Sequence, residues 1–83
     1  MKIQEMEMVL EIIDSGSISA AAKKLFISQP SLSQSIKKIE AELGTPLFIR
    51  QSGKVMAPTQ AGLAYAQAAR QILQIYNELL QTL

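Results

Sequence analysis

Apolar residues recur at helical spacing along most of this 83-residue chain, and one short β-leaning stretch interrupts them. A first helix is expected over roughly residues 2–14, because one face is apolar and the acidic residues fall on the other. Its expected apolar stripe is Ile3, Met6, Val9, Leu10 and Ile13. Gly16 suits the left-handed backbone that follows a helix, and it marks the end of this one.

Residues 17–44 predict two short helices joined by a tight turn. The first begins at 17–19 and ends near Leu25, and the small residues at 20–22 let another helix approach closely. The turn is expected at 26–27. This order of elements is the sequence shape of a DNA-binding helix-turn-helix.

The second helix of this pair is expected from about Gln29 to Leu43. Ser28 caps it, and Pro30 lies in its first turn, where a missing N–H costs nothing. Gly44 ends it. The stripe expected to be buried is Leu32, Ile36, Ile39 and Leu43.

The character of the sequence changes between residues 44 and 59. Segments 46–50 and 54–57 are β-leaning, and 51–53 between them is turn chemistry, which predicts a small hairpin or wing. Two strands alone are marginally stable, so this hairpin must lean on the helices. Leu47 and Phe48 are the expected anchors.

A last helix is expected over about 60–82, capped by Thr59 and more than about 30 Å long. Its apolar residues follow a heptad seam, which favours dimerisation through this helix. The alternative is that the stripe packs back on the chain's own core. The residues expected at the dimer interface are Tyr65, Ala69, Ile72, Leu73, Tyr76, Leu79, Leu80 and Leu83.

Composition narrows the function. The chain has no cysteine and no histidine, which excludes disulfides, the usual zinc sites and histidine-based catalysis. Its seven carboxylates are scattered and suggest no acid–base pair, so we expect neither an enzyme nor a metal or cofactor. Acidic residues interrupt every apolar run near the N-terminus, so we expect no signal peptide. No stretch approaches the length of a membrane span, and we expect a cytoplasmic location with nucleoid association through DNA binding.

The net charge of +1 hides an uneven distribution. Residues 1–14 are acidic, whereas residues 15–77 carry seven basic residues against Glu40 and Glu42. A basic middle is expected if that part faces a polyanion, although an ordinary solvated surface can have the same charges.

The exposed face of the 29–43 helix carries the candidate chemistry. A major groove admits one α-helix, and side chains near its N-terminus reach base edges. Glutamine amides, serine hydroxyls and apolar carbons suit base edges, whereas lysine, arginine and a helix N-terminus suit phosphates. The expected base contacts are Gln29, Pro30, Ser33 and Gln34, and Ala41 offers a further apolar contact on the same face. The expected DNA-backbone contacts are Ser28, Ser31, Lys37, Lys38, Arg50 and Lys54.

The chain resembles the N-terminal DNA-binding module of LysR-type transcriptional regulators over essentially its whole length. The resemblance rests on linked motifs in the family's order: Gly16-Ser17, Ala21-Ala22, Leu25, the run Ile27 to Ser33, Ile36, Ile39-Glu40, Leu43-Gly44, Pro46-Leu47-Phe48, Arg50, Thr59 and Ala61-Gly62. It departs from the family at Pro58, where leucine is usual, and in a 50–59 segment that is one residue longer.

The resemblance implies a mainly α fold: a winged helix-turn-helix over 1–58, with a three-helix core and a two-stranded wing, then a dimerisation helix over 59–83. It also implies binding to double-stranded DNA, a homodimer formed through the long helix, and a tetramer as a further possibility for the intact protein. A ligand-sensing effector domain is expected to follow and is absent from this chain, so a small-molecule effector would act only through that domain. The alternative function is a dimerisation or adaptor module that uses its helix-turn-helix for protein contacts.

Overall fold

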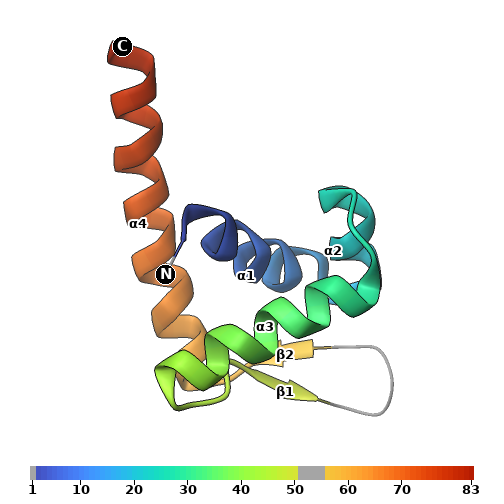
Figure 1. Ribbon diagram of the computed structural model, residues 1–83. Helices are drawn as coiled ribbons and strands as arrows, with labels where there is room; N and C mark the ends of the chain where they lie inside the picture. Colours follow the sequence, from blue (N-terminus) through green and yellow to red (C-terminus); the bar gives the residue numbers. More distant parts are fainter. Residues whose placement is uncertain (1, 51–55) are drawn as a thin grey trace.

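The computed structural model describes residues 2–50 and 56–83. The elements follow in the order α1 (Ile3–Ser15), α2 (Ile18–Leu25), α3 (Gln29–Leu43), β1 (Phe48–Arg50), β2 (Met56–Pro58) and α4 (Gln60–Thr82). In Figure 1, α4 rises along one side of the molecule and α2 lies at the opposite end. The expected mainly α fold with a two-stranded wing is confirmed. No helix in the described ranges is long and apolar enough to cross a lipid bilayer.

Side-chain caps begin three of the four helices. Ser17 Oγ accepts a hydrogen bond from the Ala20 N–H at 3.0 Å. Ser28 Oγ accepts one from the Ser31 N–H at 3.2 Å, which confirms the expected cap of α3. The Thr59 hydroxyl does the same for the Gly62 N–H at 3.0 Å, and it also donates to the Pro46 carbonyl at 2.8 Å. The polar residues read from the sequence therefore set where these helices begin.

Helix α1 lies at the centre of the fold and contacts all three other helices and β2. It is covered on more than one face, so Ile12, which the expected stripe left out, is fully buried. Glu5 was expected on the solvated acidic face and is instead buried, because its carboxylate accepts a hydrogen bond from the Lys2 N–H at 3.0 Å. The simple two-faced picture of this helix is therefore wrong.

Helix α3 packs its apolar stripe against this frame. Leu32, Ile36 and Ile39 are fully buried. The fourth expected member, Leu43, is 40% exposed, because the core ends at Ile39 and the chain turns away at Gly44, whose φ is 73°. The burial of the first three residues fixes which side of α3 faces outward.

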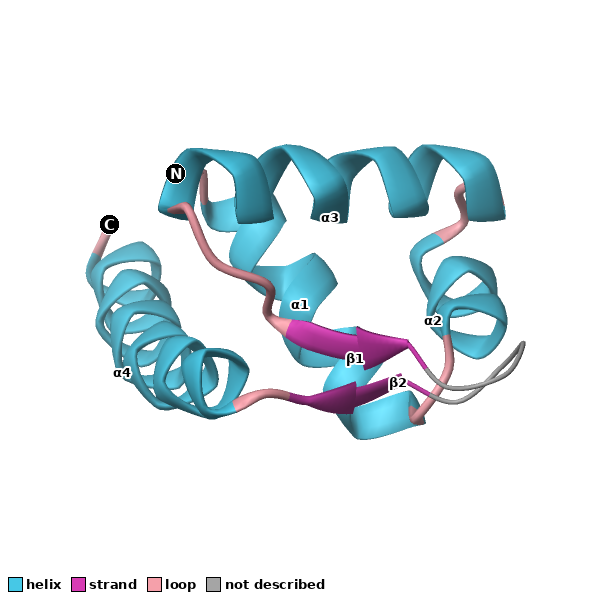
Figure 2. Ribbon diagram, turned by 90° about the horizontal axis from the view of Figure 1, so that it is seen from below, coloured by secondary structure: helices cyan, strands magenta, loops and turns pink. Residues whose placement is uncertain are grey.

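The hairpin strands are antiparallel, with Phe48 opposite Pro58 and Arg50 opposite Met56. The first strand begins at Phe48 rather than at residue 46, and the second ends at Pro58 rather than at residue 57. The expected turn at 51–53 lies outside the described residues. Figures 1 and 2 both place the hairpin beside α3, on the same side of α1.

Two kinds of contact hold the hairpin against the helices. Leu47 and Phe48 are buried in the common core, as expected. In addition, Glu40 Oε2 on α3 accepts hydrogen bonds from the Leu47 N–H at 2.7 Å and the Phe48 N–H at 3.3 Å. Its Oε1 lies 3.3 Å from Arg50 Nη2. One carboxylate thus joins α3 to both ends of the segment that carries β1.

The first half of α4 completes the core. Tyr65, Ala66 and Ala69 are buried against the domain, and Leu73 packs on the same cluster. This burial corrects the expectation that Tyr65 and Ala69 face a partner chain, since the domain itself already covers them. The alternative, that the stripe packs on its own core, is therefore right for this half of the helix. The apolar side chains that remain exposed are those of Ile72, Ile75, Tyr76, Leu79, Leu80 and Leu83.

A close approach between α4 and the chain before β1 depends on Gly62. A Cβ added there would overlap the Leu47 carbonyl oxygen, which also accepts a hydrogen bond from the Thr59 N–H at 2.9 Å. The backbone cannot move aside without losing that bond. Only glycine fits this position.

We expect Gly62→Ala to lower the free energy of unfolding by about 1–3 kcal/mol through this overlap. The sign is diagnostic, because alanine ordinarily stabilises a helix by about 1 kcal/mol relative to glycine. Ala64→Gly, at an exposed position of the same helix, measures that ordinary difference in urea denaturation. A Gly62→Ala chain as stable as the unsubstituted chain would contradict the packing described here.

Glu40→Ala leaves two partly buried N–H groups without their acceptor, so we expect it to lower the free energy of unfolding by about 1–3 kcal/mol. Glu40→Gln keeps one acceptor oxygen and should lose less. Glu42→Ala is the matched control, an exposed residue on the same helix with an expected effect of about 0.5 kcal/mol or less. Equal losses for Glu40→Ala and Glu42→Ala in urea denaturation would show that the carboxylate does not hold the hairpin.

Candidate nucleic-acid interface

The outward side of α3 carries a stripe of exposed residues opposite its buried stripe. Pro30, Gln34, Lys37 and Ala41 are all exposed, and their spacing of four, three and four residues places them on one face. Ser33 lies at the edge of this face and is partly buried. An amide, an ammonium group and two apolar side chains, with a hydroxyl at the edge, therefore line one side of a helix whose other side is fixed in the core.

The first turn of α3 is open to solvent. Gln29 and Pro30 are both exposed there. The Ser28 hydroxyl accepts from the Ser31 N–H and donates to the Ser31 hydroxyl at 2.9 Å, so these two expected DNA-backbone residues contact each other. The free N–H groups of this turn and the helix dipole give this end a partial positive charge.

Basic side chains surround the exposed stripe. Lys37 and Lys38 are exposed on α3, and the side chain of Arg50 on β1 is 45% exposed while paired with Glu40. This ion pair neutralises the charge of Glu40, the first acidic residue on α3. Lys54, the other basic residue expected at the hairpin, lies outside the described residues. The ion pair with Glu40 brings the Arg50 guanidinium to α3, the helix that carries Lys37 and Lys38, and Figure 2 shows β1 running alongside α3.

Two acidic residues of α1 pair with basic residues of other helices. Asp14 Oδ1 lies 3.0 Å from Arg70 Nη2, and this ion pair joins the end of α1 to α4. Glu11 Oε2 lies 3.8 Å from Lys24 Nζ on α2, and it also accepts a hydrogen bond from the Ser15 hydroxyl at 2.8 Å. Both pairs are at least partly exposed and contribute little to stability. Their carboxylates lie on α1 and do not neutralise Lys37 or Lys38 of α3.

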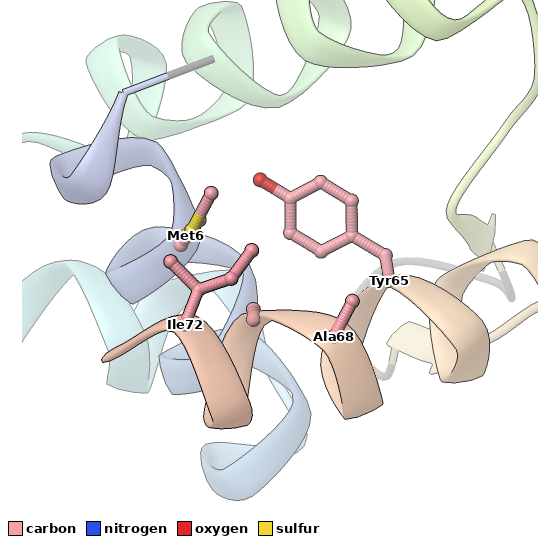
Figure 3. Close-up of a pocket in the computed structure, with 5 residues that line it drawn as sticks. Met6, Tyr65, Ala68 and Ile72 are labelled. Carbon is pink, nitrogen blue, oxygen red and sulfur yellow. The ribbon is translucent and has the colours of Figure 1, made fainter. Parts of the chain in front are cut away.

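A second candidate surface lies between α1 and α4. Met6, Tyr65, Ala68, Ala69 and Ile72 line a small apolar pocket of about 40 Å³, and Figure 3 shows Tyr65 reaching from α4 toward α1. Burial raises the pKa of the Tyr65 hydroxyl, and the carboxylates of Glu5 and Glu42 raise it further. The buried hydroxyl has no hydrogen-bond partner among the described residues.

The sequence pattern missed the structural role of one residue of α3. In the sequence, Glu40 stands out only as an acidic residue of the basic 15–77 region and as part of the Ile39-Glu40 motif. Its contacts with Leu47, Phe48 and Arg50 cross seven to ten positions of the chain. Such contacts follow from the tertiary fold, and helical periodicity carries no signal of them.

Known proteins with a similar sequence and fold are transcriptional regulators. Residues 3–63 match the family described as bacterial regulatory helix-turn-helix protein, lysR family. YcgK, an uncharacterised HTH-type transcriptional regulator of Bacillus subtilis, is 44% identical over 81 residues, which are 98% of this chain and 25% of YcgK. The chain thus spans about a quarter of the length of this relative.

The solved structures agree. The fold matches the CbnR DNA-binding domain in its DNA complex with a TM-score of 0.92 and 29% identity, covering 99% of this chain and 93% of that one. It matches the BenM DNA-binding domain bound to catB site 1 DNA with a TM-score of 0.92 and 29% identity, covering 99% and 91%. The exposed face of α3, the paired hairpin and the match over residues 3–63 lead to one assignment: the chain belongs to the lysR family of bacterial regulatory helix-turn-helix proteins.

Proposed function

We propose that this chain binds double-stranded DNA sequence-specifically, as the DNA-binding part of a bacterial transcriptional regulator. The observation that carries the proposal is the exposed stripe of α3, where the polar Gln34 and the basic Lys37 lie between Pro30 and Ala41 on a helix fixed by its buried face. The fold matches to CbnR and BenM, both solved with DNA, support it. An adaptor module would be expected to present an apolar face there, and the polar side chains on and beside the stripe argue against that: Gln29, Ser33, Gln34 and Lys37.

Four residues of α3 are proposed to contact base edges in the major groove: Gln29, Pro30, Ser33 and Gln34. A glutamine amide offers a donor and an acceptor together, which suits adenine. A serine hydroxyl can donate or accept, and a proline ring provides apolar contact. Gln29 and Pro30 lie in the first turn of α3, where side chains come nearest to the groove floor.

The backbone contacts supply affinity without sequence information. Lys37 and Lys38 are proposed to contact phosphates, and the N-terminal turn with Ser28 and Ser31 to accept a further phosphate. Arg50 is proposed to contact the DNA backbone or the adjacent minor groove from the hairpin, with Glu40 holding its guanidinium in place. Lys54 is proposed for the same side on sequence grounds alone.

We propose that α4 joins two copies of the chain. Its second half leaves a wide apolar stripe exposed from Ile72 to Leu83, and single chains rarely leave such a stripe uncovered. The pocket beside Ile72 offers a place for an apolar side chain of the partner. The 59–83 segment thus has two roles, completing the core with its first half and forming the dimer with its second.

The remaining features of the regulator concern a longer protein. Relatives such as YcgK are about four times the length of the matched segment. A small-molecule effector, a tetramer of the intact protein and a cytoplasmic site of action are proposals that follow from the family and from DNA as the target.

Replacing Gln29 by alanine should reduce affinity for the preferred sequence by about 1–3 kcal/mol and relax the preference at one position of each half-site. Lys37→Ala should weaken binding to all sequences alike and reduce the salt slope by about one unit. In vitro binding-site selection with both variants distinguishes these outcomes. A wild-type affinity that does not depend on salt in gel shifts would remove the phosphate contacts from the account.

Replacing Leu79 by aspartate places a charge in the proposed seam, where desolvation costs several kcal/mol. Leu79 is 53% exposed in the single chain, so we expect the variant to fold, to sediment as a monomer and to bind DNA more weakly. Gln74→Asp is the matched control, because it adds the same charge on the opposite face of α4. A wild-type chain that sediments as a monomer at high concentration would contradict the seam.

A further inference from the structure

Three helices of the fold end in the same left-handed backbone conformation, but with different residues. The residue after α1 is Gly16 with φ 77°, and the residue after α3 is Gly44 with φ 73°. The residue after α2 is Phe26, with φ 58° and ψ 39°. Among the described residues it is the one non-glycine residue with positive φ. Residues other than glycine, asparagine and aspartate are disfavoured in the left-handed conformation.

The cap itself does not need a phenylalanine. The Phe26 N–H bonds to the Lys23 carbonyl at 3.2 Å, and the Ile27 N–H bonds to the Ala22 carbonyl at 3.1 Å. These two backbone bonds form a Schellman motif, in which glycine is the usual left-handed residue. The apolar contact that accompanies the motif comes from Ile27, which packs against the core.

The Phe26 ring does not stabilise the core either. Phe26 is 94% exposed, which makes it the most exposed large apolar residue among those described. A strained backbone and an aromatic ring in water are both unfavourable in the free chain. Within the described part of the single chain, phenylalanine at position 26 therefore makes no contact that would offset its strained backbone and its exposed ring.

The position of Phe26 in the fold indicates which kind of ligand its ring contacts. Phe26 lies in the turn directly before α3, two residues before the Ser28 cap and three before Gln29. Figures 1 and 2 show this turn at the end of the molecule toward which the hairpin strands extend, away from α4. Lys23 and Lys24 before it are exposed, so the ring lies between a basic helix end and the proposed reading turn.

We propose that the Phe26 ring contacts the C5-methyl group of a thymine at the edge of each half-site. This inference rests on the proposed binding of α3 in the major groove. Thymine's methyl is the apolar group that base pairs display in that groove, and phenylalanine is among the side chains that recognise it. Phe26 is thereby a specificity-determining residue beyond the polar stripe of α3.

The test pairs a protein variant with a base analogue. A duplex obtained by in vitro selection with the whole chain is resynthesised with deoxyuridine in place of each thymine in turn, which removes only the methyl group. We expect one position in each half-site where the unsubstituted chain loses about fourfold in affinity for each methyl removed. Phe26→Asn should bind the parent duplex more weakly and be insensitive to deoxyuridine at that position.

Two further measurements separate recognition from folding. Phe26→Leu keeps an apolar side chain and should keep the sensitivity to deoxyuridine. The midpoint of thermal unfolding of Phe26→Asn should be equal to or above that of the unsubstituted chain, because asparagine adopts the left-handed conformation more readily. A lower midpoint would mean that the ring supports the fold, contrary to the proposal.

The outcomes distinguish this proposal from the function on which it rests. If the selected duplex binds tightly and Phe26→Asn shows the unsubstituted chain's response to every deoxyuridine, the thymine contact is wrong and DNA reading by α3 stands. If the unsubstituted chain selects no sequence while remaining folded, the proposed function is wrong and the thymine contact falls with it.

Discussion

The burial of Leu32, Ile36 and Ile39 against α1 is the constraint on which the rest of the structure depends. A helix can rotate about its own axis, and each rotation would present different side chains to a ligand. Three fully buried residues on one stripe allow only one rotation, because any other would expose them and bury lysine or glutamine. The exposed stripe of α3 is thus a consequence of the core.

The rest of the fold supports this helix from several sides. Helix α1 provides the surface on which α3 rests, and the first half of α4 covers α1 through Tyr65 and Ala69. Glu40 then fixes the hairpin relative to α3 through two backbone N–H groups. The carboxylate lies on the same helix as the proposed reading residues, so a displacement of the hairpin must either strain α3 or break these bonds. A single rigid unit presents both the reading helix and Arg50.

Local signals allowed much of this to be predicted from the sequence. The bounds of α3, the caps at Ser28 and Thr59 and the left-handed Gly16 and Gly44 each depend on a few neighbouring residues. The contacts of Glu40 and the burial of Glu5 and Ile12 depend on elements far along the chain, which periodicity does not report. The heptad pattern of α4 correctly predicted that Tyr65 and Ala69 are buried, but it did not predict that their own domain covers them. An apolar stripe has the same spacing whether its own domain or a second chain covers it. The exposure of Phe26 was missed because the turn was recognised by its position and not by its backbone conformation.

The most direct test of the account is a crystal structure of this chain with a duplex obtained by in vitro selection. We expect α3 in the major groove with the rotation seen in the free chain, so that Gln29, Pro30, Ser33 and Gln34 face base edges while Leu32, Ile36 and Ile39 remain buried. A complex in which α3 lies outside the groove, or enters it after rotating away from α1, would contradict the claim that the core determines which side chains meet the DNA.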